Sequence, residues 1–170
     1  MADEIINRVA NSGLITIDLA ECYPQGERIT YDLAQNLFQG LILKEQDFRQ
    51  FVKENDWSIY TDCYVAVSCS SDAIIPTWAY MLLTSALSKA KLVFYGTEQE
   101  MNKYILIEAV KDYLANQNLT DARVVVKGCA DLPIGPEAYI QLQQQLQPNV
   151  KALMFGEACS TVPIYKKPRV

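Results

Sequence analysis

The sequence predicts an α/β protein with a mostly parallel sheet, flanking helices and an N-terminal antiparallel hairpin. Four short, nearly continuous apolar segments recur from residue 64 onward, and such segments are typical of strands covered on both faces. Helical patterns separate these segments, and alternating strands and helices favour right-handed crossovers and a parallel sheet. Two earlier segments alternate apolar and polar residues, which is typical of strands with one exposed face.

The N-terminal hairpin is predicted from these two alternating segments, LITIDL (14–19) and RITYDL (28–33). A loop that contains proline and glycine joins them, as expected for a turn. A short amphipathic helix follows in KEQDFRQFVKEN (44–55), where apolar residues recur on one face. We therefore expect residues 1–60 to form a hairpin-and-helix subregion of a single domain that spans residues 1–170.

The remaining residues, 61–170, are predicted to form strand–helix repeats. The expected strands are YVAVSC (64–69), KLVFYG (91–96), ARVVVKG (122–128) and KALMFGE (151–157). The expected helices cover residues 75–88, 98–116 and 136–147. Thr97 and Glu100 form a capping box for the second of these helices. All four strands are expected in one mainly parallel sheet.

Parts of this region recur sixty residues apart. Cys69 aligns with Cys129, and Pro76 aligns with Pro136, each at the point where a strand gives way to a helix. Two explanations remain open. One is internal duplication, and the other is turn chemistry that any two strand–helix–strand units share, since proline is common in the first turn of a helix.

The composition argues against several classes of function. The chain has no histidine, which excludes Ser-His-Asp triads, Cys-His nucleophile pairs and imidazole metal ligands. A net charge of −5 without a basic stripe argues against nucleic-acid binding. The longest uncharged run, 73–88, is too short to span a membrane, and MADEIINRV is not a secretory signal. We expect a cytoplasmic protein with reduced cysteines and no membrane partner.

Three of the five cysteines follow predicted strands: Cys69, Cys129 and Cys159. In an open parallel sheet, ligands gather beyond the carboxyl ends of the strands, so we expect these thiols to meet at one edge. Three thiolates suit zinc or an iron–sulfur cluster. Glu157, at the end of the last strand, is predicted to be a fourth ligand or to lie beside the ligands.

Hydroxyl groups beside the cysteines favour an alternative. Ser70, Ser71, Ser160 and Thr161 lie where helix N-termini or loops are expected, and hydroxyls with free amides bind anions such as phosphate or a carboxylate. Capping of a helix is the simpler role for such residues. A third reading is a thiol or persulfide enzyme that uses one thiolate at a helix N-terminus, although the usual histidine base is absent.

Several stretches together resemble a family of small bacterial proteins known only as a domain of unknown function. These stretches are ANSGLITIDL, FQGLILKEQDFRQFV, CSSDAIIPTWAYML, KGCADLP and FGEACSTVPIYKK. Genes of that family tend to lie beside those of the SUF-type iron–sulfur cluster assembly system. The resemblance implies a non-catalytic accessory protein that holds a metal or cluster, with assembly proteins as partners. The competing expectation is a small-molecule-binding or anion-binding α/β domain with incidental cysteines.

Overall fold

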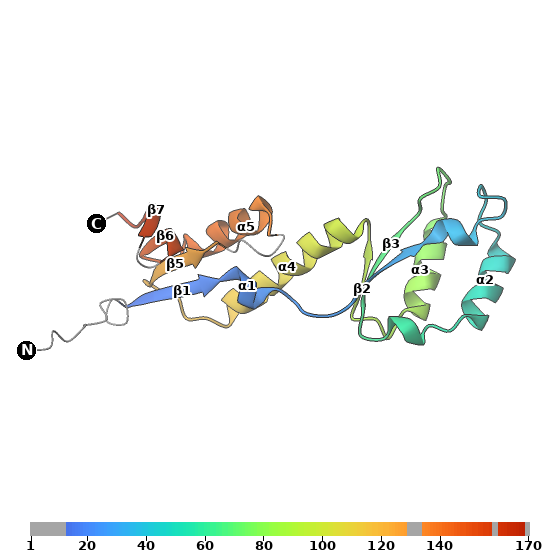
Figure 1. Ribbon diagram of the computed structural model, residues 1–170, viewed down its shortest axis with the longest axis horizontal. Helices are drawn as coiled ribbons and strands as arrows, with labels where there is room; N and C mark the ends of the chain where they lie inside the picture. Colours follow the sequence, from blue (N-terminus) through green and yellow to red (C-terminus); the bar gives the residue numbers. More distant parts are fainter. Residues whose placement is uncertain (1–12, 129–133, 158–159, 169–170) are drawn as a thin grey trace, which may run out of the picture. The chain divides into compact units, whose positions relative to one another are not determined.

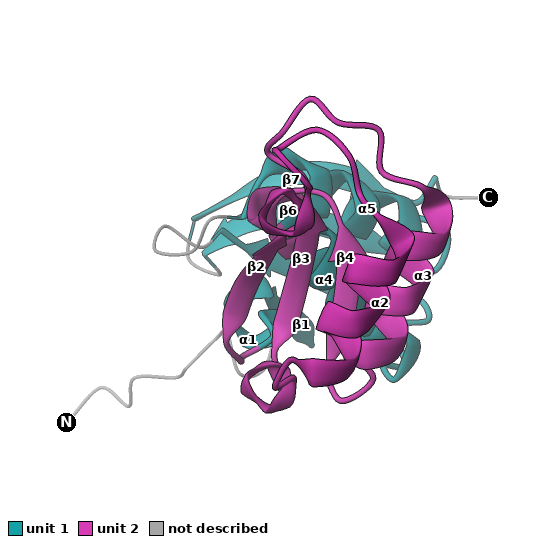
Figure 2. Ribbon diagram, turned by 90° about the vertical axis from the view of Figure 1, so that its right-hand side faces the viewer, with its two compact units in different colours: residues 1–24, 103–170 teal, residues 25–102 magenta. Residues whose placement is uncertain are grey.

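The structure is a computed structural model that describes residues 13–128, 134–157 and 160–168 (Figure 1). The chain divides into two compact units, which Figure 2 colours separately. Unit 1 comprises residues 1–24 and 103–170, and unit 2 comprises residues 25–102. The subregion boundary expected near residue 60 lies inside unit 2. Among the described helices, none is long and apolar enough to cross a membrane.

Unit 2 contains a three-stranded parallel sheet in the order β2-β3-β4. Its elements are β2 (Arg28–Asp32), the 3-10 helix η1 (Leu33–Asn36), α2 (Glu45–Glu54), the 3-10 helix η2 (Ser58–Tyr60), β3 (Tyr64–Ser68), α3 (Thr77–Ala86) and β4 (Leu92–Tyr95). The helices α2 and α3 contribute Phe48 and Leu83 to a core that also includes Val65 and Val67 of β3. These four side chains are almost completely buried, so this unit has a hydrophobic core of its own.

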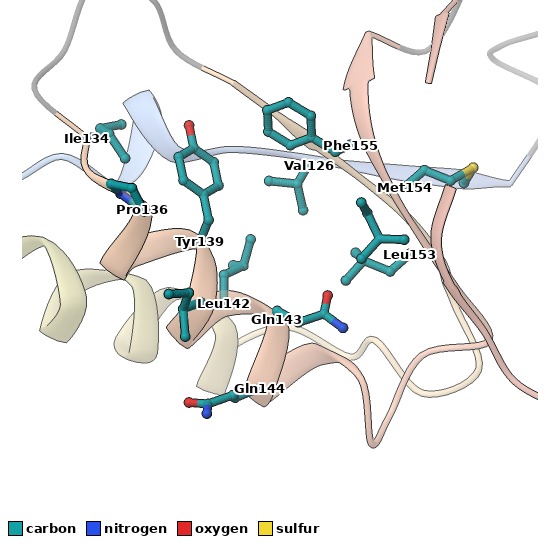
Figure 3. A pocket seen from close by; sticks show the side chains of 12 residues that line it. Val126, Ile134, Pro136, Tyr139, Leu142, Gln143, Gln144, Leu153, Met154 and Phe155 are labelled. Carbon is teal, nitrogen blue, oxygen red and sulfur yellow. The ribbon is translucent and has the colours of Figure 1, made fainter. Parts of the chain in front are cut away.

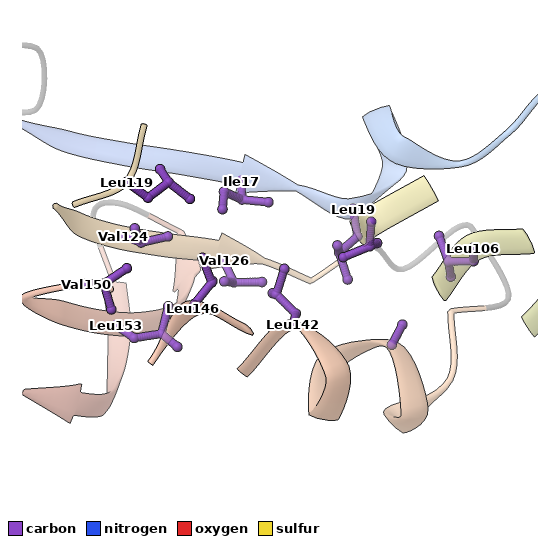
Figure 4. Close-up of a cluster of buried hydrophobic side chains, with 12 residues drawn as sticks. Ile17, Leu19, Leu106, Leu119, Val124, Val126, Leu142, Leu146, Val150 and Leu153 are labelled. Atoms are coloured by element: carbon purple, nitrogen blue, oxygen red, sulfur yellow. The ribbon is translucent and has the colours of Figure 1, made fainter. Parts of the chain in front are cut away.

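Unit 1 contains a four-stranded sheet in the order β1-β5-β6-β7. Its elements are β1 (Leu14–Asp18), α1 (Leu19–Cys22), α4 (Glu98–Ala115, in this unit from residue 103), β5 (Arg123–Lys127), α5 (Pro136–Leu146), β6 (Ala152–Glu157) and β7 (Ser160–Lys166). The first three strands are parallel, and β7 is antiparallel to β6. Figure 4 shows the core, in which Leu142 and Leu146 of α5 lie against Val126 and Leu153 of the sheet.

The two units repeat one arrangement of strands and helices. In each, a first strand is followed by a helix, a central strand, a second helix and a third strand, and all three strands are parallel. The first strands and the two residues after each are nearly identical in sequence. They read ITIDLA (15–20) and ITYDLA (29–34), and they differ only where Ile17 corresponds to Tyr31. Their aspartates act alike, because Asp18 accepts a hydrogen bond from the Ala20 amide at 2.9 Å and Asp32 accepts one from the Ala34 amide at 2.9 Å. This correspondence favours internal duplication.

The predicted α/β class with mostly parallel strands is confirmed, but the strands are distributed differently. The expectation of four strands in one sheet is wrong, since β3 and β4 belong to one sheet and β5 and β6 to the other. The N-terminal strands also do not form the predicted antiparallel hairpin. Instead, β1 pairs in parallel with β5, and β2 pairs in parallel with β3. Both are edge strands, and an edge strand alternates apolar and polar residues just as a hairpin strand does.

The long helix α4 begins as the sequence predicts. The Thr97 amide donates to Glu100 Oε2 at 2.8 Å, and the Glu100 amide donates to Thr97 Oγ1 at 3.2 Å. These reciprocal bonds are those of a capping box, which satisfies amides that have no partner within the helix. The predicted start of this helix is therefore confirmed.

Candidate functional site

The carboxyl edge of the unit 2 sheet is held together by Asp32, the last residue of β2. Its carboxylate accepts hydrogen bonds from the Ser70 amide at 2.9 Å and the Ser70 hydroxyl at 2.5 Å, in addition to the Ala34 amide. The hydrogen bond from the Ser70 side chain, followed by those from backbone amides, lowers the pKa of the Asp32 carboxyl, because all of them favour the charged form. Asp32 therefore fastens the segment after β3 to the end of β2.

Ser71 and Cys69 belong to the same segment. The Ser71 hydroxyl donates to the carbonyl oxygen of Gly40 at 2.7 Å, and the Cys69 thiol donates to the carbonyl oxygen of Ser71 at 3.5 Å. The following helix begins only at Thr77, with Pro76 before it. The Ser70 and Ser71 hydroxyls are thus not at a helix N-terminus, and both already donate to oxygens of the protein.

The carboxyl edge of the unit 1 sheet carries charged side chains. Lys127 Nζ lies 3.6 Å from Asp18 Oδ2 and 3.7 Å from Glu157 Oε1. The three residues end β5, β1 and β6, which are neighbours in the sheet. The side chain of Glu157 is 62% exposed, and Lys127 is its cationic neighbour. The protein itself therefore supplies a cation beside this carboxylate.

Ser160 and Thr161 begin β7, where they pair with Glu157 and Gly156 of β6. The sequence places them in a loop or at a helix N-terminus, but they lie in a strand. Backbone amides in an antiparallel ladder are used by the neighbouring strand in alternation. An anion would find no helix N-terminus at these two positions.

The predicted three-cysteine site assumed that all three thiols follow strands of one sheet, and this assumption is wrong. Cys69 follows β3 in the sheet of unit 2, whereas Cys129 and Cys159 follow β5 and β6 in the sequence of unit 1. Cys129 and Cys159 lie outside the described residues, so the predicted convergence of the three thiols is not tested directly. Within the described ranges, no group of three cysteine, aspartate or glutamate side chains is arranged to hold a metal ion.

The two other cysteines, Cys22 and Cys63, have raised pKa values. Burial, followed by the nearby Glu27 and Asp62, raises the pKa of the Cys63 thiol. Burial also raises the pKa of Cys22, with smaller contributions from neighbouring carboxylates. A thiol with a raised pKa is less often the reactive thiolate.

An apolar groove on unit 1 is a feature that the sequence analysis does not predict. It has a volume of about 540 Å³ and lies between α5 and the strands β5, β6 and β7. Figure 3 shows Tyr139 of α5 and Phe155 of β6 beside each other at one end. Their rings form a T-shaped pair with centroids 5.6 Å apart, a favourable arrangement of aromatic quadrupoles.

The lining of the groove is almost entirely apolar. Its residues are Val126, Ile134, Pro136, Tyr139, Ile140, Leu142, Gln143, Gln144, Leu153, Met154, Phe155 and Ile164. Ile140 is 57% exposed and lies off the buried stripe that Ala138, Leu142 and Leu146 form on α5. An isoleucine on the polar side of an amphipathic helix is the signal in the sequence that indicates this surface.

The fold and site thus define a two-unit α/β protein with an apolar groove on one unit. The chain belongs to the family described as "Protein of unknown function (DUF2480)", whose model matches residues 3–167. This match supports the expected resemblance to an uncharacterised family. It does not address the expected gene neighbourhood. No curated protein and no solved structure matches the chain.

Proposed function

We propose that the protein is a binding protein, and that the groove of unit 1 holds a small molecule with an apolar body. The observation that carries this proposal is the groove itself. Its volume of about 540 Å³ falls in the range of about 300–1,000 Å³ that is typical of ligand pockets. Pockets of this kind are mostly apolar with a few polar groups that orient the ligand, and Gln143 and Gln144 supply amides here.

The same lining favours binding over catalysis. Among the described residues that line the groove, none carries a carboxylate, an amine or a thiol. General acid–base and nucleophilic catalysis most often use such groups, and among the described lining residues Tyr139 alone has an ionisable side chain. Burial of apolar ligand surface contributes roughly 25 cal/mol per Å². The free energy of binding therefore comes mainly from the aliphatic and aromatic walls.

A fluorescence titration with the apolar dye Nile red tests the proposal. We expect saturable binding at one site per chain. Ile140→Glu places a charge on the groove wall and should weaken binding by at least about tenfold, since a bound apolar ligand would cover this charge and leave it unpaired. Met81→Glu is the matched control, because Met81 precedes Ile140 by 59 residues, occupies the same position in α3 and is also exposed.

The outcome distinguishes binding in the groove from non-specific adsorption of the dye. Binding that weakens in Ile140→Glu and persists in Met81→Glu supports the groove as the site. Binding that does not saturate, or that is equal in both variants and the parent, would overturn the proposal. Circular dichroism of each variant confirms that the fold is retained.

We also propose a narrower form of the metal hypothesis, in which unit 1 alone supplies the ligands. The observation that favours it is the pairing of β5 with β6 as parallel neighbours, because Cys129 and Cys159 each follow the end of one of these strands by two residues. Two thiolates and Glu157 would suit zinc or an iron–sulfur cluster. The protein would then act as a non-catalytic accessory with iron–sulfur assembly proteins as partners.

Elemental analysis and an absorption spectrum of anaerobically purified protein test this second proposal. We expect stoichiometric zinc or iron in the parent, loss in Cys129→Ser and Cys159→Ser, and weaker retention in Glu157→Ala. Cys69→Ser is the matched control and should retain the metal, because Cys69 follows a strand of the other sheet. A parent protein without zinc or iron would overturn the proposal, as would loss of metal in the Cys69 variant alone.

A further inference from the structure

The exposed face of α3 and of the residues that follow it carries no charge. Its exposed positions are Thr77, Met81, Thr84, Ser85 and Ser88, and no charged residue occurs anywhere between residues 73 and 88. Met81 is 70% exposed. Interfaces between proteins are depleted in charged residues at their centres and enriched in methionine and aromatic residues. Solvent-facing helix surfaces of ordinary soluble proteins usually carry charges.

An aromatic pair lies beside this uncharged face, and aromatic residues are also enriched at protein interfaces. Tyr80 of α3 forms a T-shaped pair with Tyr95 of β4, with ring centroids 5.3 Å apart. Tyr95 is 73% exposed. The pair corresponds to Tyr139 and Phe155 in unit 1, which have nearly the same geometry. Both repeats therefore place a similar aromatic pair over the second helix and third strand.

The two surfaces differ in what lies next to them. In unit 1, β7 pairs with β6 and contributes Ile164 to the wall of the groove. In the described part of unit 2, the sheet ends at β4 and has no fourth strand. The surface over α3 and Tyr95 thus lacks the cover that the chain itself supplies at the corresponding place in unit 1.

We propose that a second copy of this chain covers the exposed face of α3, with the two α3 helices antiparallel across a two-fold axis. An axis between Thr84 and Ser85 places Met81 opposite Ser88 of the partner subunit. Met81 is then about 5 Å from the axis along α3, at 1.5 Å per residue, and Ser88 lies two residues beyond the end of the helix at Ala86. In this register the long Met81 side chain of one subunit faces a small serine side chain of the other.

Charge favours a second copy over other occupants. A two-fold contact brings the same patch of both subunits together, so any charge near its centre would meet a like charge. A patch without charge avoids this repulsion in a chain whose net charge is −5. An anionic membrane surface attracts basic residues, and the exposed positions of this face contain none.

The surface is small. The helix α3 (Thr77–Ala86) is about 15 Å long, and one helix face buries less than the roughly 1,600 Å² of a standard interface. We therefore expect a reversible dimer with a dissociation constant in the range of about 1–100 µM rather than an obligate dimer.

Sedimentation equilibrium of the full chain, at concentrations from about 1 to 200 µM, tests this proposal. We expect the parent to shift from monomer to dimer, and Met81→Glu to raise the dissociation constant at least tenfold. Ser85→Arg should do the same with a charge of opposite sign. Ile140→Glu is the control that should dimerise like the parent, because it changes the corresponding position of unit 1.

A parent that remains monomeric over this range would overturn the proposal. A dimer that persists in both Met81→Glu and Ser85→Arg would also overturn it, as would a dimer lost in Ile140→Glu alone. Circular dichroism verifies that each variant is folded, and if one variant fails to fold, the other decides. The dye titration reads out the groove separately, so failure of either proposal is distinguishable from failure of the other.

Discussion

Gly156 is the position in β6 where a single methyl group should be least tolerated. Its φ angle is +123°, and a Cβ atom placed there would lie 2.6 Å from the carbonyl oxygen of Ser160. Gly156 pairs with Thr161 in the turn region that joins β6 and β7. Substitution by alanine should therefore strain the backbone and push the start of β7 away from β6.

The expected loss of stability follows from two contributions. A non-glycine residue in a sparsely populated backbone region costs about 1–3 kcal/mol. Displacement of a backbone carbonyl adds to this, because no flexible side chain is available to move. We expect Gly156→Ala to lower the free energy of unfolding by about 3 kcal/mol, or the melting temperature by about 6–12 °C for a chain of this size.

Urea denaturation monitored by circular dichroism measures this loss. Gly13→Ala is the matched control in the same unit, because Gly13 also has a positive φ of +62° but no heavy atom lies within 4 Å of its Cβ position. The control should lose only about 1 kcal/mol, the usual cost of a left-handed conformation. Equal losses in the two variants would refute the close approach of β6 and β7 as the cause.

Three other predictions concern individual side chains. Ser70→Ala should raise the pKa of the Asp32 carboxyl toward its ordinary value, as measured by NMR titration. Because the folded-state pKa of Asp32 is lowered, its contribution to stability in the parent is present above about pH 4 and is lost as the pH falls through the lowered value, and the variant should show less of this loss. Cys22 and Cys63 should be alkylated slowly at neutral pH and rapidly in urea, as read by mass spectrometry, because their raised pKa values depend on the fold. Leu142→Ala should lower stability by about 2–5 kcal/mol in urea denaturation, since Leu142 is buried in the core of unit 1.

Individual elements of the fold could be predicted from short stretches of sequence. The helix expected at 136–147 is α5 (Pro136–Leu146), and the strand expected at 64–69 is β3 (Tyr64–Ser68). The capping box of Thr97 and Glu100 marked the start of α4. These features depend on interactions between residues a few positions apart, such as caps, apolar runs and turn residues, so the local sequence is sufficient to specify them.

The candidate site was harder to predict from the sequence, because it depends on which strands are neighbours in a sheet. Cys69 and Cys129 follow similar strand segments, and the similarity suggested one shared edge. Each segment instead belongs to its own sheet, so the assumption of a single sheet, which placed the cysteines at one edge, does not hold. The groove depends on β7 lying beside β6, and the sequence pattern predicts no strand over Ser160–Lys166.

The sequence by itself therefore determined the α/β class, the helices and the strands that are buried on both faces. Only the tertiary structure decided how the strands are shared between two sheets. The strand β1 pairs with β5, so Leu14 lies opposite Arg123 although all residues of unit 2 come between them in the sequence. A strand of alternating residues fits any sheet edge that offers an apolar face, and the choice among such edges is made by packing of distant segments into one core.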